Sequence, residues 1–325
     1  SWYGSPFACC TAERLLCDPA APPAGELMTI DRSVRDDIAS ALGQDYEIVR
    51  ELGRGGASVV YLGRDRVLGR EVAIKVIRDS QAGDREAVAR FEREARTLAA
   101  LQHPNIVMLY GARQLSGGSL ALVMQHGEWS TLKALIRERG PMPIDAVEQV
   151  LQDVATALGY LHKHQVIHRD IKPENIMLEG RDRRALVMDF GISKSAGTSE
   201  RGLTGTGMVM GTPEYMSPEQ AAGDRELDHR SDQYSLAMIG YRMLAGRAPF
   251  EADSVQTLLV KQVTETPPPL RSIAPDVPEP VAAAVERALA KRPEDRFPSM
   301  GEFAAALSAA REPGTPGAIR RHAST

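Results

Sequence analysis

Apolar residues in the first third of the chain follow strand patterns, with one helical interruption. The stretches "YEIVREL", "SVVYLGRD" and "REVAIKVIR" within residues 46–78 are rich in β-branched and aromatic residues and are separated by glycine-containing turns. Residues 84–101 carry apolar side chains at positions 88, 91, 95, 98 and 101, the spacing of one helix face. Two more apolar stretches, "NIVMLYGAR" and "SLALVMQH", flank "QLSGG" and predict a hairpin. This part is therefore predicted to be mostly sheet, with one helix.

From about residue 130 the pattern becomes helical. Residues 144–164 carry apolar side chains with helical spacing behind a proline suited to a helix start. Further helices are predicted at 231–245, 254–264, 280–291 and 299–310, and the proline-rich residues 264–280 are predicted to form an ordered loop. The pattern divides the chain into a leader (1–27), an amino-terminal extension with a helix (28–45), a sheet-rich lobe (46–124), a hinge (125–130), a helical lobe (131–310) and a polar tail (311–325).

Composition narrows the class of protein. The chain has 325 residues, 43% of them hydrophobic and 25% charged, which is typical of a globular protein. Its net charge of −4 argues against a general nucleic-acid binder, and no apolar run has the length of a membrane span. All three cysteines (Cys9, Cys10 and Cys17) precede residue 18, which fits a reducing compartment and predicts a cytoplasmic location. Residues 1–27 lack the pattern of a signal peptide, and we expect Met28 to be the natural start or the leader to be disordered.

A glycine-rich stretch, "LGRGGASVVYLG", lies between the first two predicted strands. Gly53 and Gly55 occupy two positions of a G-x-G-x-x-G pattern, and Ser58 occupies the third. A dinucleotide-binding fingerprint would lead into a helix, whereas this stretch leads into a strand. The stretch alone fits either a hairpin that covers phosphates or a mobile surface turn.

A lysine and an acid make the phosphate interpretation stronger. Lys75 lies on the next predicted strand, and Glu94 lies on the helix that follows. Leu98 and Leu101 share the helix face of Glu94 and direct it toward the core, whereas Glu92 points elsewhere. We expect Lys75 to hold phosphate and to pair with Glu94.

The segments "VIHRDIKPENIML" (166–178) and "LVMDFGISK" (186–194) contain the remaining reactive groups. Asn175 and Asp189 offer the oxygen ligands that magnesium prefers. Asp170 can then accept a proton from an attacking hydroxyl, and Lys172 can neutralise charge on a phosphoryl group in transfer.

Together these motifs resemble those of eukaryotic-like protein kinases, in particular the bacterial serine/threonine type, from about residue 46 to residue 307. The resemblance implies an α+β fold of two lobes: a small antiparallel sheet with one key helix, and a larger, mainly helical lobe. It implies ATP and Mg²⁺ as cofactors, with Mn²⁺ as an alternative metal, and protein substrates. It makes Asp170 the catalytic base, supported by Lys172, Lys75 and Glu94, and makes Asn175 and Asp189 the metal ligands. The ATP-binding residues it implies are Leu52, Gly53, Arg54, Gly55, Gly56, Ala57, Ser58, Val59, Val60, Ala73, Lys75, Met124, Gln125, Gly127 and Met177.

The resemblance continues through the predicted helical lobe. "GTPEYMSPEQ" (211–220) resembles a substrate-docking loop, in which Glu219 is expected to pair with Arg296. Asp232 is expected to hold the backbone of the catalytic loop. Lys172 and Thr212 match serine/threonine rather than tyrosine kinases.

Regulation and two rival functions complete the predictions. Thr204 and Thr206 match the paired threonines that similar bacterial kinases autophosphorylate, and a homodimer would allow this reaction in trans. Arg169 and Lys194 would form the basic pocket for the phosphate. One rival is a catalytically inactive scaffold, which the full set of reactive residues disfavours. The other is a small-molecule phosphotransferase, a class that usually lacks the docking loop.

Overall fold

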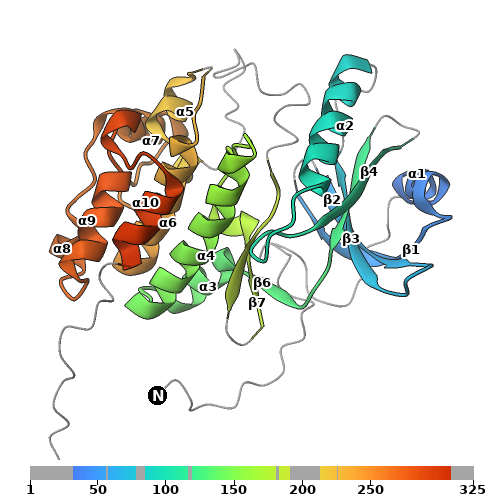
Figure 1. Ribbon diagram of the computed structural model, residues 1–325, viewed down its shortest axis with the longest axis horizontal. Helices are drawn as coiled ribbons and strands as arrows, with labels where there is room; N and C mark the ends of the chain where they lie inside the picture. The colour runs from blue at the N-terminus through green and yellow to red at the C-terminus, as the bar shows by residue number, and fades with distance from the viewer. Residues whose placement is uncertain are drawn as a thin grey trace, which may run out of the picture.

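The computed structural model describes residues 32–55, 58–77, 85–115, 119–180, 183–190, 213–224 and 226–308. Its amino-terminal lobe is an antiparallel sheet with spatial order β1-β2-β3-β5-β4. The strands are β1 (Tyr46–Arg54), β2 (Ser58–Asp65), β3 (Glu71–Ile77), β4 (Leu109–Gln114) and β5 (Leu120–Gln125). Helices α1 (Arg32–Leu42) and α2 (Arg85–Ala99) lie on opposite sides of this sheet (Figure 1).

Side-chain alternation along the strands gives the sheet two apolar faces. On one face, Tyr61 and Ile74 are fully buried against Ile38 and Leu42 of α1. On the other face, Ala73 and its neighbours join the core that includes Phe91, Ala95 and Leu98 of α2. The central strands β2, β3 and β5 are therefore mostly buried on both sides, whereas the edge strands β1 and β4 are partly exposed.

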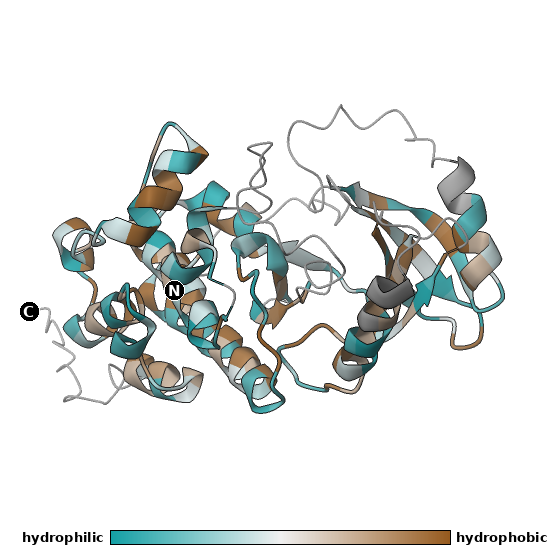
Figure 2. Ribbon diagram, turned by 90° about the horizontal axis from the view of Figure 1, so that it is seen from above, coloured by the Kyte–Doolittle hydropathy of each residue, from teal (hydrophilic) through white to brown (hydrophobic). Residues whose placement is uncertain are grey.

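The carboxy-terminal lobe is mainly helical and is built around α4 and α6 (Figure 1). Its helices are α3 (Leu132–Arg139), α4 (Ile144–Lys163), α5 (Pro218–Ala222), α6 (Arg230–Ala245), α7 (Val255–Thr264), α8 (Leu270–Ile273), α9 (Glu279–Ala288) and α10 (Met300–Ser308). Helix α6 is buried on nearly all sides, whereas the surrounding helices carry alternating hydrophobic and hydrophilic bands (Figure 2). A small sheet of β6 (Trp129–Thr131), β7 (Ile176–Glu179) and β8 (Arg184–Val187) lies between the lobes.

The predicted fold class is confirmed, and several short elements are additions to it. Strands β1 to β5 and the longer helices lie within or close to the predicted ranges. Helices α3 and α5 and the sheet β6-β7-β8 were not predicted, and the proline-rich loop contains the single helical turn of α8. Among the helices in the described ranges, including the 20-residue α4, none is long and apolar enough to cross a membrane.

Candidate active site

The predicted base and its neighbours meet in the loop between α4 and β7. Lys172 Nζ lies 2.9 Å from Asp170 Oδ2. The Asn175 side-chain amide donates to the same carboxylate oxygen (3.1 Å) and to the backbone carbonyl of Asp170 (2.8 Å). The Asp170 and Lys172 side chains are 21% and 19% exposed, so solutes can still reach them. The loop therefore presents a carboxylate whose orientation is fixed by a cation and an amide.

A buried aspartate forms hydrogen bonds with the backbone of this loop. Asp232 of α6 is 1% exposed and accepts hydrogen bonds from the backbone amides of His168 (2.9 Å) and Arg169 (2.8 Å). It also accepts from His162 Nε2 at 2.8 Å. Burial alone would raise the pKa of Asp232, but these hydrogen bonds and the nearby histidines lower it below its usual value. Asp232 therefore stays ionised and anchors the loop as predicted.

Two residues of the site have left-handed backbones. Arg169 has φ 64° and Asp189 has φ 59°, values that cost a residue other than glycine about 1–2 kcal/mol. His168 lies between the two segments: its Nε2 is 3.0 Å from the carbonyl oxygen of Met188, and its ring lies 5.5 Å from that of Phe190. The fully buried His168 ring thus holds the two strained segments together.

Lys75 projects from β3 toward Asp189. Its Nζ lies 2.6 Å from Asp189 Oδ2, with the two side chains 17% and 22% exposed. Glu92 pairs with Arg96 on the exposed side of α2, which agrees with its exclusion from the site, and Glu94 is half-buried on the same helix. The expected pairing of Lys75 with Glu94 stays a prediction, because the ion pair that the described residues show for Lys75 is with Asp189.

An apolar wall lies next to the ion pair of Lys75 and Asp189. Ala73, Met124 and Met177 are buried in the core shared by the two lobes, and Leu52 and Val60 pack against the same core. Val59 is an exception to the predicted ATP-binding set, because strand alternation turns its side chain to the opposite face, among the residues that pack with α1. The wall is therefore formed by residues of β1, β2, β3, β5 and β7.

The glycine-rich stretch forms the end of a hairpin. Gly53 pairs with Val60 and Arg54 with Val59 across β1 and β2, and the Gly55 amide donates to the Ser58 carbonyl at 2.8 Å. Arg54 pairs with Glu51 at 3.0 Å. This is the strand–glycine–strand arrangement that the sequence predicts. Gly56 and Ala57, which follow Gly55 in the sequence, lie outside the described residues, as do Thr204, Thr206, Thr212, Lys194, the leader and the tail.

The segment that joins the lobes follows β5. The amide of Gln125 donates to the Met108 carbonyl (2.8 Å), and the carbonyl of Gly127 accepts from the Trp129 amide (3.0 Å). The segment directly follows Met124 of the apolar wall, and the expected contacts of Gln125 and Gly127 with ATP stay a prediction.

Comparisons with known proteins agree with this geometry. Residues 46–305 match the family described as "Protein kinase domain". The chain belongs to the protein kinase family. It is 40% identical over 271 residues to serine/threonine-protein kinase PknB of Mycobacterium tuberculosis, a match that covers 82% of this chain and 43% of PknB. It is 38% identical over 281 residues to serine/threonine-protein kinase pkn3 of Myxococcus xanthus, covering 84% of this chain and 51% of pkn3.

A solved structure gives the same result. The crystal structure of the Mycobacterium tuberculosis PknI kinase domain matches with a TM-score of 0.66 at 30% identity, covering 82% of this chain and 96% of that one. The matched segments span about half or less of PknB and pkn3. The region 46–305 is thus a kinase domain of the bacterial serine/threonine type.

Protein kinases use ATP with a divalent cation, and the residues present fit such a cation. The Asn175 amide nitrogen donates to Asp170, which leaves the side-chain oxygen as the atom suited to a metal. The Met188 amide donates to the Asn175 carbonyl at 2.9 Å, so Asp189, the next residue, adjoins Asn175. One carboxylate and one amide oxygen from adjoining segments suit Mg²⁺, which takes few protein ligands and completes its shell with phosphate and water.

The predicted pairing of Glu219 with Arg296 is confirmed. Arg296 Nη1 and Nη2 each donate to a separate Glu219 oxygen at 2.8 Å, and Ser231 Oγ donates to Glu219 at 2.7 Å. Burial would raise the pKa of Glu219, but the Arg296 hydrogen bonds and charge lower it below its usual value. This buried bidentate pair connects α5 to the chain after α9.

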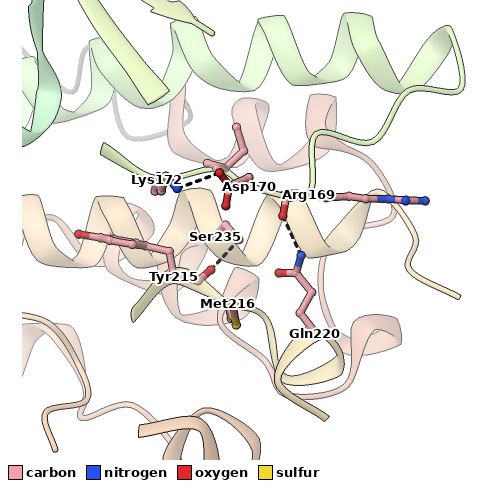
Figure 3. Close-up of a pocket in the computed structure, with 8 residues that line it drawn as sticks. Arg169, Asp170, Lys172, Tyr215, Met216, Gln220 and Ser235 are labelled. Carbon is pink, nitrogen blue, oxygen red and sulfur yellow. Dashed lines mark hydrogen bonds and ion pairs between the residues drawn. The ribbon is translucent and has the colours of Figure 1, made fainter. Parts of the chain in front are cut away.

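Two polar residues that help to hold the catalytic loop were not predicted from the sequence: one contacts Asp232, and the other contacts the loop itself. His162, at the end of α4, bonds the buried Asp232, and Gln220 of α5 donates to the Arg169 carbonyl at 3.0 Å (Figure 3). Neither residue belongs to a sequence motif that indicates a particular reaction. The position of His162 six residues before His168, at the end of a predicted helix, is the one sequence signal that could have drawn attention to it.

Proposed function

We propose that this domain transfers the γ-phosphate of ATP to serine and threonine hydroxyls of proteins. The observation that carries the proposal is the Asp170 carboxylate, which contacts Lys172 and Asn175 in a loop hydrogen-bonded to the buried Asp232. A carboxylate held in this way suits a proton acceptor for a substrate hydroxyl.

Each remaining group has a role consistent with its position. Asp170 accepts the hydroxyl proton and aligns the oxygen for attack. Lys172, 2.9 Å from Asp170, stabilises negative charge on the phosphoryl group in transfer. Lys75 holds the ATP phosphates, and its ion-pair partner Asp189 would hold Mg²⁺ together with Asn175. When bound, the cation neutralises phosphate charge.

Positioning and charge stabilisation must provide most of the rate. General-base assistance contributes about 10²–10⁴-fold, whereas preorganised charges in a partly water-excluded site often contribute more. Buried Asp232 and His168 fix the loop in advance, so little reorganisation is needed when the hydroxyl arrives.

The proposal includes activation by phosphorylation. Thr204 or Thr206 becomes phosphorylated, with Thr206 favoured, and the phosphate binds Arg169 and Lys194. A second copy of the domain delivers the phosphoryl group in trans. We assign the reaction to the cytoplasm, because ATP is available there and the kinase region contains no cysteine.

One experiment tests the proposal. Purified protein is incubated with radiolabelled ATP, Mg²⁺ and a mixture of protein substrates, in parallel with Asp170→Asn and a chelator control. We expect transfer by the wild type to serine and threonine, self-labelling at Thr204 or Thr206, and a loss of at least about 10²-fold in Asp170→Asn.

Three results would contradict the proposal in different ways. Equal transfer by wild type and Asp170→Asn would remove Asp170 from the mechanism. Tight ATP binding without transfer to any protein would favour the scaffold. Transfer to aminoglycosides or choline, but not to protein, would favour the small-molecule phosphotransferase.

A further inference from the structure

Gln220 connects the docking segment to the residue that precedes the proposed base. It lies in α5, next to Glu219, and its amide nitrogen donates to the Arg169 carbonyl at 3.0 Å across a separation of 51 residues (Figure 3). Arg169 immediately precedes Asp170. The same pocket is lined by Asp170, Lys172 and Tyr215, so Gln220 contacts the loop close to its reactive end.

Arg169 needs support because its backbone is strained. Its φ of 64° lies in the left-handed region, which a bulky residue keeps when the surroundings hold it in place. Asp232 accepts from the Arg169 amide at 2.8 Å, and Gln220 donates to the Arg169 carbonyl at 3.0 Å. The two bonds hold the residue from α6 on one side and from α5 on the other. The Arg169 carbonyl belongs to the same planar peptide group as the Asp170 amide. A hydrogen bond to this carbonyl therefore restricts the position of the Asp170 backbone.

The side-chain oxygen of Gln220 has a separate structural role. It accepts from the Ser217 backbone amide at 3.1 Å and completes the capping box of α5, in which the Gln220 backbone amide donates to Ser217 Oγ. The oxygen therefore stabilises the helix start, whereas the nitrogen holds the catalytic loop. A single substitution can separate the two tasks, because glutamate is also a standard capping-box residue but has no side-chain donor when ionised.

We propose that Gln220 is a positioning residue for phosphoryl transfer, which fixes the strained Arg169–Asp170 peptide and transmits the placement of the docking segment to Asp170. This inference rests on the proposed kinase function. Loss of the bond affects the chemical step more than nucleotide binding, because Gln220 contacts the catalytic loop and not the apolar wall.

The variant Gln220→Glu keeps the cap and removes the donor. Initial rates of transfer to casein are measured over a range of ATP and casein concentrations for the wild type and the variant. We expect kcat to fall about tenfold, the effect of one lost hydrogen bond on a positioned group. The KM for ATP and the melting temperature should stay close to the wild-type values. Hydrogen exchange of the peptide 166–172 should become faster.

Gln152→Glu is a matched control. Gln152 of α4 also donates its amide to a backbone carbonyl, that of Ala304 at 2.6 Å, in a contact between α4 and α10. This substitution should lower the melting temperature and leave kcat unchanged. If the role of Gln220 is purely structural, Gln220→Glu should likewise lower the melting temperature and leave kcat unchanged.

The outcomes separate this inference from the kinase proposal. Wild-type transfer with an unchanged kcat and unchanged exchange in Gln220→Glu would overturn the positioning role. Absence of transfer by the wild type would overturn the kinase proposal. In that case the exchange of residues 166–172 still tests the structural premise: unchanged exchange overturns the restraint of the loop by Gln220, and faster exchange supports that restraint.

Discussion

At the scale of single residues, Lys291 carries a charge in an unfavourable place. Its Nζ donates to the Gln262 carbonyl (2.7 Å) and lies 4.4 Å from the centre of the Phe250 ring. Burial, together with repulsion from Arg296, lowers the pKa of Lys291 to about 8, against attraction from Glu265. Above pH 8 the folded protein thus releases a proton that the unfolded chain keeps up to its higher pKa. Stability from this group therefore increases as the pH rises through that window.

We expect this gain to disappear in Lys291→Met. Urea unfolding at pH 7.5 and pH 9.5 should show that the wild type gains about 1–2 kcal/mol relative to the variant, less than the full shift because solvent reaches part of the side chain. Lys163→Met, at the exposed end of α4, is the control: it keeps Lys291, so the wild type should show no such gain relative to it. A gap between wild type and Lys291→Met that is the same at both pH values would mean that the ammonium titrates normally.

At the scale of elements, α1 acts as part of the amino-terminal lobe. Ile38 is 0% and Leu42 2% exposed, both against the outer face of the sheet. Ile38→Ala should reduce the unfolding free energy of this lobe by about 2–5 kcal/mol, since it removes buried carbons and leaves a cavity. Hydrogen exchange in β2 and β3 gives the readout, and Ser40→Ala on the exposed side of α1 is the control. Equal exchange in both variants would show that α1 is dispensable for the sheet.

Element length explains what the sequence could predict. Strands β1 to β3 and helix α4 are long enough for apolar periodicity to be recognised, and α6 is recognisable as a long run that is mostly buried. Helices α5 and α8 have five and four residues and β6 has three, too few for a period to appear. Helix α3 is different: Leu132, Leu135 and Ile136 are buried with helical spacing, so the signal was present in the sequence.

The site was predictable to the extent that its residues belong to motifs. Asp170, Asn175 and Asp189 belong to sequence motifs that indicate their chemistry. The Glu219–Arg296 pair follows from the resemblance to protein kinases. The Gln220–Arg169 and Lys75–Asp189 contacts join residues 51 and 114 positions apart. Such contacts depend on tertiary packing, which a single sequence does not encode locally.

At the scale of the whole molecule, the two lobes meet at a segment that requires glycine. A Cβ added to Gly127 would lie 2.5 Å from Trp129 Nε1 and 2.6 Å from Cε2. The indole is itself held, because Nε1 donates to Glu179 at 3.2 Å across β6 and β7. Gly127→Ala should therefore displace the indole or the hinge backbone. We expect the KM for ATP to rise about tenfold, consistent with an overpacking cost of about 1–3 kcal/mol.

Two further variants show whether the indole is the cause. Gly111→Ala, on β4, adds the same methyl group where no atom lies within 4 Å and should leave the KM for ATP unchanged. In Gly127→Ala/Trp129→Ala the clash is absent, so the KM for ATP should return to that of Trp129→Ala alone. If the alanine at 127 raised this KM equally with and without Trp129, the requirement for glycine would instead arise from the hinge backbone.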